Sequence, residues 1–265
     1  MALSMNLKYT SQLDTLIRRF PCFAKLKNQQ IWEYEESDLK KFFDGQIKRV
    51  DRRNTYRWKV PSLPFFDHKA EISALPVMFI GKTGYGKSTL LNYIIGHTVF
   101  SVDDIMPCTS EIDAAFFRLG ADPMYYLCLC DLPGVGESMQ ADQKYIKWYT
   151  ELVQYSPSVV YVLRADQRDF SVDEKAMNHL FPTQDARDKV VVALNYADKL
   201  GATSRESEGF SELEDALEKK VEIVADHFSI DSYRIFPCCA HNGYGVEDLL
   251  GEVTDDLSLC VYEAE

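Results

Sequence analysis

From about residue 71, short apolar runs alternate with stretches in which apolar residues recur at helical spacing. The runs are rich in Val, Ile and aromatic residues, as strands are. We predict strands at Val77–Ile80, Ile112–Leu119, Tyr125–Asp131, Val159–Arg164, Val190–Asn195 and Arg234–Cys238. We predict helices at Lys87–Ile95, Asp142–Tyr155, Asp173–Leu180, Glu212–Phe228 and Val246–Leu257. Such alternation favours an α/β fold with a mostly parallel sheet between helices.

The first 70 residues have a different pattern. Two amphipathic stretches have helical spacing, one from Leu13 to Phe20 and one from Leu39 to Ile47, and Pro61 and Pro64 mark the passage into the main domain. We therefore predict a helical extension over 1–70 and a main domain over 71–265. The extension is either an arm that docks a partner or a layer packed along the main domain, and we slightly favour packing.

Charge divides the chain at the same place. The net charge is −12, but residues 1–70 carry 14 Lys/Arg and 8 Asp/Glu, for a net +6, which leaves −18 for the rest. The acidic part should repel nucleic acid and anionic lipid, so that only residues 1–70 could attract them. The charged residues Arg164, Asp166 and Arg168, after a predicted strand, are expected to form local ion pairs, with a partner contact as the alternative.

The cysteines and the longest apolar run indicate where in the cell the protein is expected. The seven cysteines include no C-x-x-C pair, and we expect Cys128 and Cys130 to be buried thiols in a reducing cytosol. The run Val159–Leu163 is far too short to cross a bilayer, and no secretion signal is visible. These features predict a cytoplasmic protein without a membrane span.

A glycine-rich segment between the first strand and the first helix of the main domain fits G-x-x-x-x-G-K-[ST], the Walker A pattern of a P-loop. Its glycines let backbone N–H groups surround phosphate oxygens, and the helix N-terminus favours anions. We expect Lys87 to neutralise the β- and γ-phosphates and Ser88 to bind Mg²⁺. The predicted phosphate-binding residues are Gly81, Lys82, Thr83, Gly84, Tyr85, Gly86, Lys87, Ser88 and Thr89.

Two further segments predict the rest of a magnesium site and a γ-phosphate sensor. Asp131 ends a strand and begins a D-x-x-G motif, so its carboxylate could hold Mg²⁺ through water, and the Gly134 N–H could meet the γ-phosphate. Thr109, in the polar loop before the second strand, could complete the magnesium coordination, with Ser110 as the alternative. The predicted metal ligands are therefore Ser88, Thr109 and Asp131.

The strand Val190–Asn195 leads into a segment that resembles a guanine-recognition loop. Asp198 could accept hydrogen bonds from N1–H and the N2 amine of guanine, a donor pair that adenine lacks. Asn195 would brace this loop, and Tyr196 stands where the N-K-x-D motif has a lysine, so that it could offer an aromatic face instead. Lys199 follows directly, and we include it among the predicted nucleotide-binding residues.

After the last strand, Cys239 and Ala240 complete the predicted nucleotide site, and the Ala240 N–H could donate to guanine O6. The segments GKTGYGKS, PCTSE, DLPGVGES, NYADK and CCAHNGYG, in this order, resemble the Era/TrmE-like bacterial GTPases. The combination is most similar to a prophage-associated branch labelled 50S ribosome-binding GTPases, with septin- and GIMAP-like GTPases as the second kinship.

The resemblance implies a three-layer P-loop NTPase domain of the small GTPase type. It also implies a six-stranded sheet with one antiparallel strand, two nucleotide-dependent switches, and GTP or GDP bound with Mg²⁺. A protein partner or a second copy of the chain would dock on the switches. The residues themselves give no support to RNA or the ribosome as a partner.

The expected reaction is attack of water on the γ-phosphate, for which we predict Lys87, Thr109, Gly134 and Glu137 as catalytic residues. Val135 occupies the position of the water-orienting glutamine of Ras-like enzymes and cannot polarise water. Glu137 could act through a second water, or it is simply a solvated glutamate. We therefore expect slow intrinsic turnover. Two alternatives stay open: a guanine-nucleotide-binding scaffold with negligible turnover, and an ATPase or nucleoside kinase.

Overall fold

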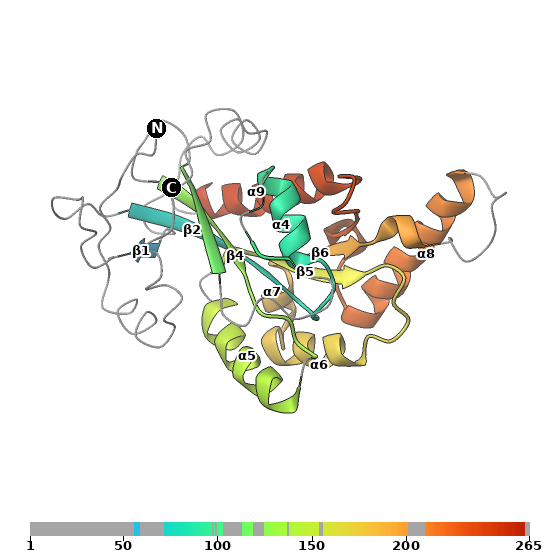
Figure 1. Cartoon of the computed structure of the whole chain (residues 1–265), viewed down its shortest axis with the longest axis horizontal. Helices are drawn as coiled ribbons and strands as arrows, with labels where there is room; N and C mark the ends of the chain where they lie inside the picture. The colour runs from blue at the N-terminus through green and yellow to red at the C-terminus, as the bar shows by residue number, and fades with distance from the viewer. Residues whose placement is uncertain are drawn as a thin grey trace.

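A seven-stranded sheet forms the centre of the molecule (Figure 1). The computed structural model describes residues 56–58, 72–96, 98, 100–102, 113–118, 125–136, 138–153, 156–200 and 210–262. The strands are β1 (Tyr56–Trp58), β2 (Ile72–Gly81), β3 (Asp113–Arg118), β4 (Tyr125–Asp131), β5 (Ser158–Arg164), β6 (Val190–Asn195) and β7 (Ile235–Pro237). Their order is β3-β4-β2-β5-β6-β7, with β1 paired to β2.

Five neighbouring strands, β4, β2, β5, β6 and β7, run parallel, whereas β3 is antiparallel to β4. The predicted mostly parallel α/β sheet is therefore confirmed, and a strand lies at each of the six predicted places, but the sheet has seven strands rather than the six that the family resemblance implies. The structure adds β1, which is antiparallel to β2. Apart from β1, which is a strand, the predicted helical extension over 1–70 lies outside the described residues.

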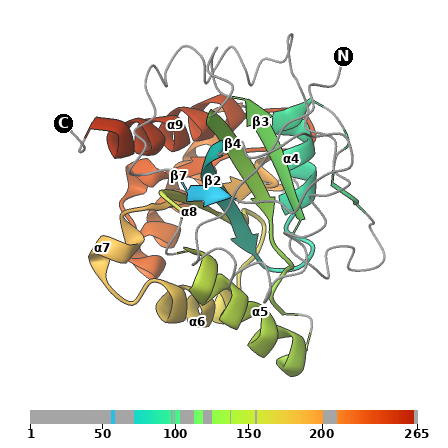
Figure 2. The same cartoon turned by 90° about the vertical axis from the view of Figure 1, so that its left-hand side faces the viewer.

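Helices cover both faces of the sheet (Figure 2). They are α4 (Lys87–Ile95), α5 (Met139–Leu152), α6 (Ser171–Leu180), α7 (Gln184–Arg187), α8 (Phe210–Phe228) and α9 (Val246–Tyr262), with 3-10 turns η3 (Ala197–Lys199) and η4 (Ser232–Arg234). One face carries α4 and α9, and the opposite face carries α5 and α6. The helices other than α7 were predicted, and α5 begins earlier because Ser138 accepts a hydrogen bond from the Ala141 amide as its N-cap.

The middle of the core is formed by β5 and β6. All six residues of β6 and the first six of β5 are buried, and most of them are Val or Leu. A strand covered by helices on both faces has no solvent side, so its sequence is continuously apolar rather than alternating. The polar ends of these strands therefore emerge together at one edge of a rigid, dry sheet.

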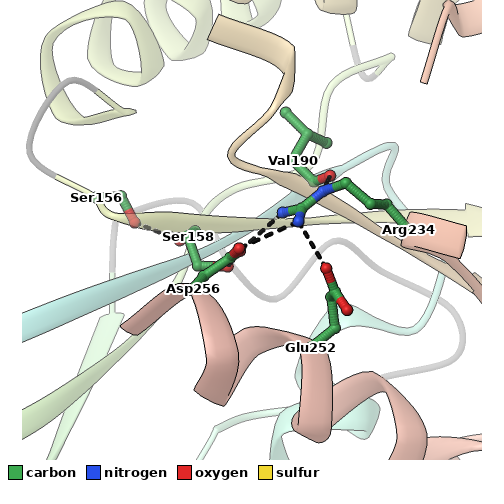
Figure 3. A network of polar contacts seen from close by, with 6 residues as sticks. All are labelled: Ser156, Ser158, Val190, Arg234, Glu252 and Asp256. Carbon is green, nitrogen blue, oxygen red and sulfur yellow. Dashed lines mark hydrogen bonds and ion pairs between the residues drawn. The ribbon is translucent and has the colours of Figure 1, made fainter. Parts of the chain in front are cut away.

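At the opposite edge, a buried arginine joins four elements (Figure 3). Arg234 donates from Nε to the Val190 carbonyl at 3.0 Å and from its terminal nitrogens to Glu252 at 2.6 Å and Asp256 at 2.8 Å. Asp256 also accepts a hydrogen bond from Ser158 at 2.7 Å. The network ties α9 to the first residues of β5 and β6, so the far ends of these strands are held in register.

Candidate functional site

The glycine-rich segment forms the loop between β2 and α4, as its sequence predicts. Gly84 and Gly86 have φ values of 79° and 82°, in the left-handed region that favours glycine. At Gly86 the backbone is also crowded, because a Cβ there would lie 2.5 Å from Asn195 Nδ2. The loop thus brings its backbone close to the segment that follows β6. Thr89 lies in the first turn of α4, partly exposed.

Lys87 begins α4, and its charge lies within the loop. The side chain is buried, and its ammonium group donates to the carbonyl oxygens of Gly81 at 3.3 Å and Lys82 at 3.2 Å. A buried ammonium needs such acceptors, because desolvation is costly for a charge. The positive charge is therefore held at the N-terminus of α4, where the helix itself favours anions.

Two predicted magnesium ligands meet directly. Ser88 Oγ, in the first turn of α4, donates to Asp131 Oδ2 at 2.5 Å, and Asp131 is 1% exposed at the end of β4. A hydroxyl beside a carboxylate is the oxygen donor pair that suits Mg²⁺ with nucleotide phosphates. The predicted ligands Thr109 and Ser110 lie outside the described residues, among which no group of three Asp, Glu, His or Cys side chains is arranged so that it could hold a metal ion.

The D-x-x-G backbone lies against the phosphate loop. Thr83 N–H donates to the Val135 carbonyl at 2.9 Å, and Val135 N–H donates to the Gly81 carbonyl at 3.2 Å. Between these bonds, a Cβ on Gly134 would come within 2.2 Å of Thr83 Oγ1, so this position has room for glycine alone. From α5, the Tyr149 hydroxyl donates to the Pro133 carbonyl. The predicted catalytic residue Glu137 is outside the described part of the chain.

Asn195 joins the phosphate loop to the loop after β7. Its Nδ2 donates to the Tyr85 carbonyl at 3.0 Å, and its Oδ1 accepts a hydrogen bond from the Ala240 N–H at 3.0 Å. The bracing role expected of Asn195 thus has a structural counterpart. The Ala240 N–H, expected to reach guanine O6, is directed to Asn195 instead, because the asparagine side chain is buried against it.

Asp198 lies in the turn η3, directly after β6. Lys199 Nζ is 3.1 Å from Asp198 Oδ2, with Lys199 largely exposed. Desolvation by itself would raise the pKa of Asp198, but hydrogen bonds from Cys239 and Lys199 outweigh it, and the net pKa is lowered. The carboxylate is therefore ionised at neutral pH and can act as a hydrogen-bond acceptor only.

Tyr196 and Arg164 form a contact that the sequence did not indicate. Tyr196 has φ 60°, and its Cε2 lies 3.4 Å from the position that a Cβ on Gly86 would occupy. The Arg164 guanidinium lies over the Tyr196 ring at 4.3 Å from its centroid. Arg164 also pairs with Asp166 at 2.7 Å, which confirms the expected local ion pair.

A buried carboxyl behind the phosphate loop was also missed. Asp173 in α6 accepts hydrogen bonds from the hydroxyls of Tyr85 and Tyr161, each at 3.2 Å. Desolvation raises the pKa of Asp173 to about 6, and the two tyrosine hydrogen bonds oppose it only in part. The sequence holds no signal for this cluster, since its members lie on β5, α6 and the phosphate loop.

Residues 76–196 match the family model described as 50S ribosome-binding GTPase. The uncharacterised Escherichia coli (strain K12) protein YkfA is 38% identical over 130 residues, covering 49% of this chain and 44% of YkfA. YfjP of the same strain is 30% identical over 166 residues, covering 62% and 55%. The chain therefore spans about half the length of these two relatives.

A probable GTP-binding protein EngB of Gemmatimonas aurantiaca is 25% identical over 198 residues, covering 72% of this chain and 87% of EngB. The solved structure of Era with MgGDPNP and a segment of 16S ribosomal RNA has a TM-score of 0.53 at 18% identity, over 69% of this chain and 57% of Era. Toc33 from Arabidopsis thaliana with Mg²⁺ and GMPPNP has a TM-score of 0.54 at 17% identity, over 92% and 95%.

At such identities the two solved structures show a common fold. Within the described residues no helix has the length and apolarity needed to cross a membrane. The family match spans the phosphate loop, the D-x-x-G segment and β6 with the first residue after it. Residues 76–196 therefore match the family described as 50S ribosome-binding GTPase, and this match, together with the EngB similarity and the fold, supports a P-loop GTPase of the Era/EngB-like type.

Proposed function

We propose that the protein binds GTP and GDP with Mg²⁺ and hydrolyses GTP to GDP and phosphate, as a nucleotide-dependent switch with slow intrinsic turnover. One observation carries the proposal: the Asn195 side chain bonds both to the phosphate loop, at Tyr85, and to the loop after β7, at Ala240. Asp198 follows three residues after this bridge, in η3, so we expect its carboxylate to lie where the base would bind. A single nucleotide can then reach both its phosphate and its base partners.

Phosphate binding would use the loop backbone and Lys87. The left-handed glycines Gly84 and Gly86 turn the loop before α4, whose N-terminus attracts anions. The buried ammonium of Lys87 would exchange its carbonyl acceptors for β- and γ-phosphate oxygens, which are stronger acceptors because they are charged. These interactions are the same for any nucleoside triphosphate, so they do not select the base.

Base selection would fall to Asp198. Its ionised carboxylate matches the two adjacent donors of guanine, N1–H and the N2 amine. Adenine offers an acceptor at N1, so ATP would leave the carboxylate facing a lone pair, which binding sites penalise strongly. The loop after β7 would border the base at Cys239, whose thiol is already directed at Asp198. This arrangement argues against an ATPase or a nucleoside kinase.

Magnesium would be held by Ser88 and Asp131, with Thr109 as the proposed third protein ligand. When bound, Mg²⁺ would neutralise charge on the β- and γ-phosphates. Ser88 Oγ and Asp131 Oδ2, which are bonded to each other in this structure, would be the two oxygens that hold the ion, with Asp131 acting through water. The carboxylate is nearly inaccessible to water, and its charge is therefore weakly screened where the ion would bind.

Hydrolysis would be slow because the D-x-x-G segment supplies no polar side chain at the next position. Val135 is 2% exposed and cannot orient water. Lys87 would stabilise the charge that develops on the γ-phosphate, and the Gly134 N–H would contact it. We assign Glu137 a role through a second water. We further propose that a partner protein or a second copy of the chain supplies the missing group at the switches.

The four buried free thiols among the described residues, Cys128, Cys130, Cys238 and Cys239, suit a reducing compartment, and we therefore propose that the protein acts in the cytoplasm.

The test is a pair of measurements on the full chain. Equilibrium binding of fluorescent GDP, GTP and ADP with Mg²⁺ should show a preference for guanine nucleotides, and single-turnover phosphate release should be measurable but slow. Equal affinity for ADP and GDP would contradict the proposal. Rapid phosphate release from the isolated chain would contradict the need for a partner.

A second candidate function is a nucleotide-dependent scaffold that binds GTP or GDP and turns over negligibly. It is favoured by Val135, whose backbone is bonded to the phosphate loop on both sides, at Thr83 and Gly81. A segment held in this way has little freedom to admit and orient water. Phosphate release from the parent chain and from Glu137→Ala separates the two functions, since a scaffold shows no release in either case.

A further inference from the structure

We propose that Arg164 is a positioning residue for the guanine nucleotide: it fixes the Tyr196 ring in the position that a lysine occupies in the N-K-x-D motif. The inference rests on the proposed function, because it concerns how this chain binds the base without that lysine. Four observations carry it: the backbone of Tyr196, the place of its ring, the orientation of Arg164, and the strand register that brings the two together.

Tyr196 lies between the base-recognition turn and the phosphate loop. Its φ of 60° lies in the left-handed region and is unusual for a non-glycine residue. The ring edge lies against Gly86, because a Cβ there would be 3.4 Å from Tyr196 Cε2 and 3.6 Å from its hydroxyl oxygen. The ring thus borders the phosphate loop next to the turn that carries Asp198.

The Arg164 guanidinium lies over this ring and is held by Asp166. Its central carbon lies 4.3 Å from the ring centroid, and Nε and Nη2 donate to Asp166 Oδ1 at 2.9 Å and Oδ2 at 2.7 Å. Two parallel hydrogen bonds set the plane of a guanidinium, which a single bond would leave free to rotate. The hydrogen bond with Asp166 is also the main cause of the raised pKa of Arg164, so the cation is permanent.

The parallel sheet brings Arg164 to this place. Arg164 is the last residue of β5 and stands in register with Asn195, the last residue of β6. The Ala165 N–H then donates to the Asn195 carbonyl at 2.8 Å, which ties the end of β5 to the residue before Tyr196. An arginine at this register position can therefore reach over Tyr196, the residue that directly follows β6.

This pair can do for a purine what a lysine stem and ammonium would do. With the guanidinium over one face of the Tyr196 ring, the opposite face would serve as the aromatic surface for guanine. The arginine also brings a positive charge beside the nucleotide. Without Arg164 the ring would lose its support on one side and would have to be ordered when the nucleotide binds. Ordering at that moment costs affinity.

The test compares Arg164→Ala in two backgrounds on the full chain, with fluorescent GDP and GTP titrated in the presence of Mg²⁺. In the parent chain the variant should bind both nucleotides roughly 3- to 10-fold more weakly, the effect expected of a half-exposed cation–π pair. In a Tyr196→Lys background, which restores the lysine, the same substitution should change affinity by less than about 2-fold. Arg168→Ala, an exposed arginine of the same loop, is the matched control.

Arg164→Lys keeps the charge but cannot make the two-bond contact with Asp166, and should lie between the parent chain and Arg164→Ala. Unchanged affinity in Arg164→Ala, or an equal loss in both backgrounds, would overturn the inference, and far-UV circular dichroism checks that the variants fold. If the parent chain itself shows no guanine preference, the proposed function fails instead. The two failures are therefore distinguishable.

Discussion

The amide of Thr83 in the phosphate loop donates to the carbonyl of Val135, just after the D-x-x-G motif, at 2.9 Å. With the return bond from the Val135 N–H to Gly81, it forms a short parallel bridge between two segments that are distant in sequence. The phosphate loop and the predicted second switch are therefore one connected unit. A disturbance in one of them should reach the other through main-chain bonds, without passing through the rest of the sheet.

Gly134→Ala should break this bridge. The new methyl group would come within 2.2 Å of Thr83 Oγ1 and 2.4 Å of the Thr83 nitrogen, so the D-x-x-G backbone must move away. We expect a loss of about 1–3 kcal/mol in unfolding free energy, measured with urea, and a fall in single-turnover phosphate release. Gly251→Ala on α9, where a Cβ meets nothing within 4 Å, is the control and should be neutral or slightly stabilising.

Ser88→Ala should reduce the magnesium dependence of nucleotide binding. In the parent chain, chelating Mg²⁺ with EDTA should weaken GDP binding, because Ser88 and Asp131 would no longer share an ion with the β-phosphate. In the variant, the factor by which EDTA weakens GDP binding should be about tenfold smaller than in the parent chain, equivalent to about 1.4 kcal/mol. Thr150→Ala on α5, which removes a hydroxyl remote from the site, is the control. An unchanged EDTA effect in Ser88→Ala would argue against this magnesium site.

Asp198→Asn should change the base preference of the protein from guanine to xanthine. An amide in place of the carboxylate offers a donor and an acceptor, which suits the N1–H and the O2 of xanthine better than the two donors of guanine. We expect GDP affinity to fall by at least about 100-fold, or roughly 3 kcal/mol, and XDP affinity to rise. Asp215→Asn, an exposed carboxyl on α8, serves as the matched substitution. Retained preference for GDP over XDP would remove Asp198 from base recognition.

Asp173→Asn should change how stability depends on pH. The folded pKa of about 6 is above the ordinary 3.8, so the folded state binds more protons than the unfolded state between these values. The contribution of Asp173 to stability therefore decreases as pH rises through this window and is constant above it. From pH 5 to pH 7.5, the variant should gain about 1 kcal/mol of unfolding free energy relative to the parent chain.

Urea unfolding at the two pH values measures this difference, with Asp226→Asn, an exposed carboxyl on α8, as the matched substitution. The same shift with pH in the parent chain and in Asp173→Asn would mean that Asp173 titrates normally.

Arg234→Ala should be strongly destabilising. It removes the countercharge of Asp256 and Glu252, whose pKa values burial already raises, and leaves the Val190 carbonyl without its arginine donor. We expect a loss of about 3–5 kcal/mol in unfolding free energy by urea denaturation. The double variant Arg234→Met with Asp256→Leu should recover part of it, because the more buried of the two carboxylates is removed together with the arginine, and the Glu252 carboxylate that remains is the more exposed one. Equal instability of the single and double variants would contradict this account.

Most of the sheet could be predicted from local pattern. Apolar runs such as Val190–Asn195 have no alternative to burial, and their order among helices implied parallel pairing. The short strand β1 was missed, because three residues carry too little pattern to be distinguished from a loop. The direction of β3 came from the family resemblance and not from its own residues, since an apolar strand reads the same in either direction.

The residues of the site divide in the same way. Gly86, Lys87, Ser88 and Asp131 were identifiable because a motif places them at a strand end or helix start, where one backbone geometry recurs. Two other contacts could not be identified from the sequence: the hydrogen bond from the Ala240 N–H to Asn195, and those from two tyrosines to Asp173. Each depends on side chains from separate strands and helices.

The sequence by itself therefore determined which segments form strands, helices and the phosphate loop, because hydrophobic period and glycine conformation act over a few neighbouring residues. It also determined that a tyrosine replaces the lysine of the guanine motif. Only the tertiary structure decided that Arg164 lies over this tyrosine and that Val135 is bonded to the phosphate loop. Both contacts join residues from different loops, and such contacts are set by strand register across the whole sheet.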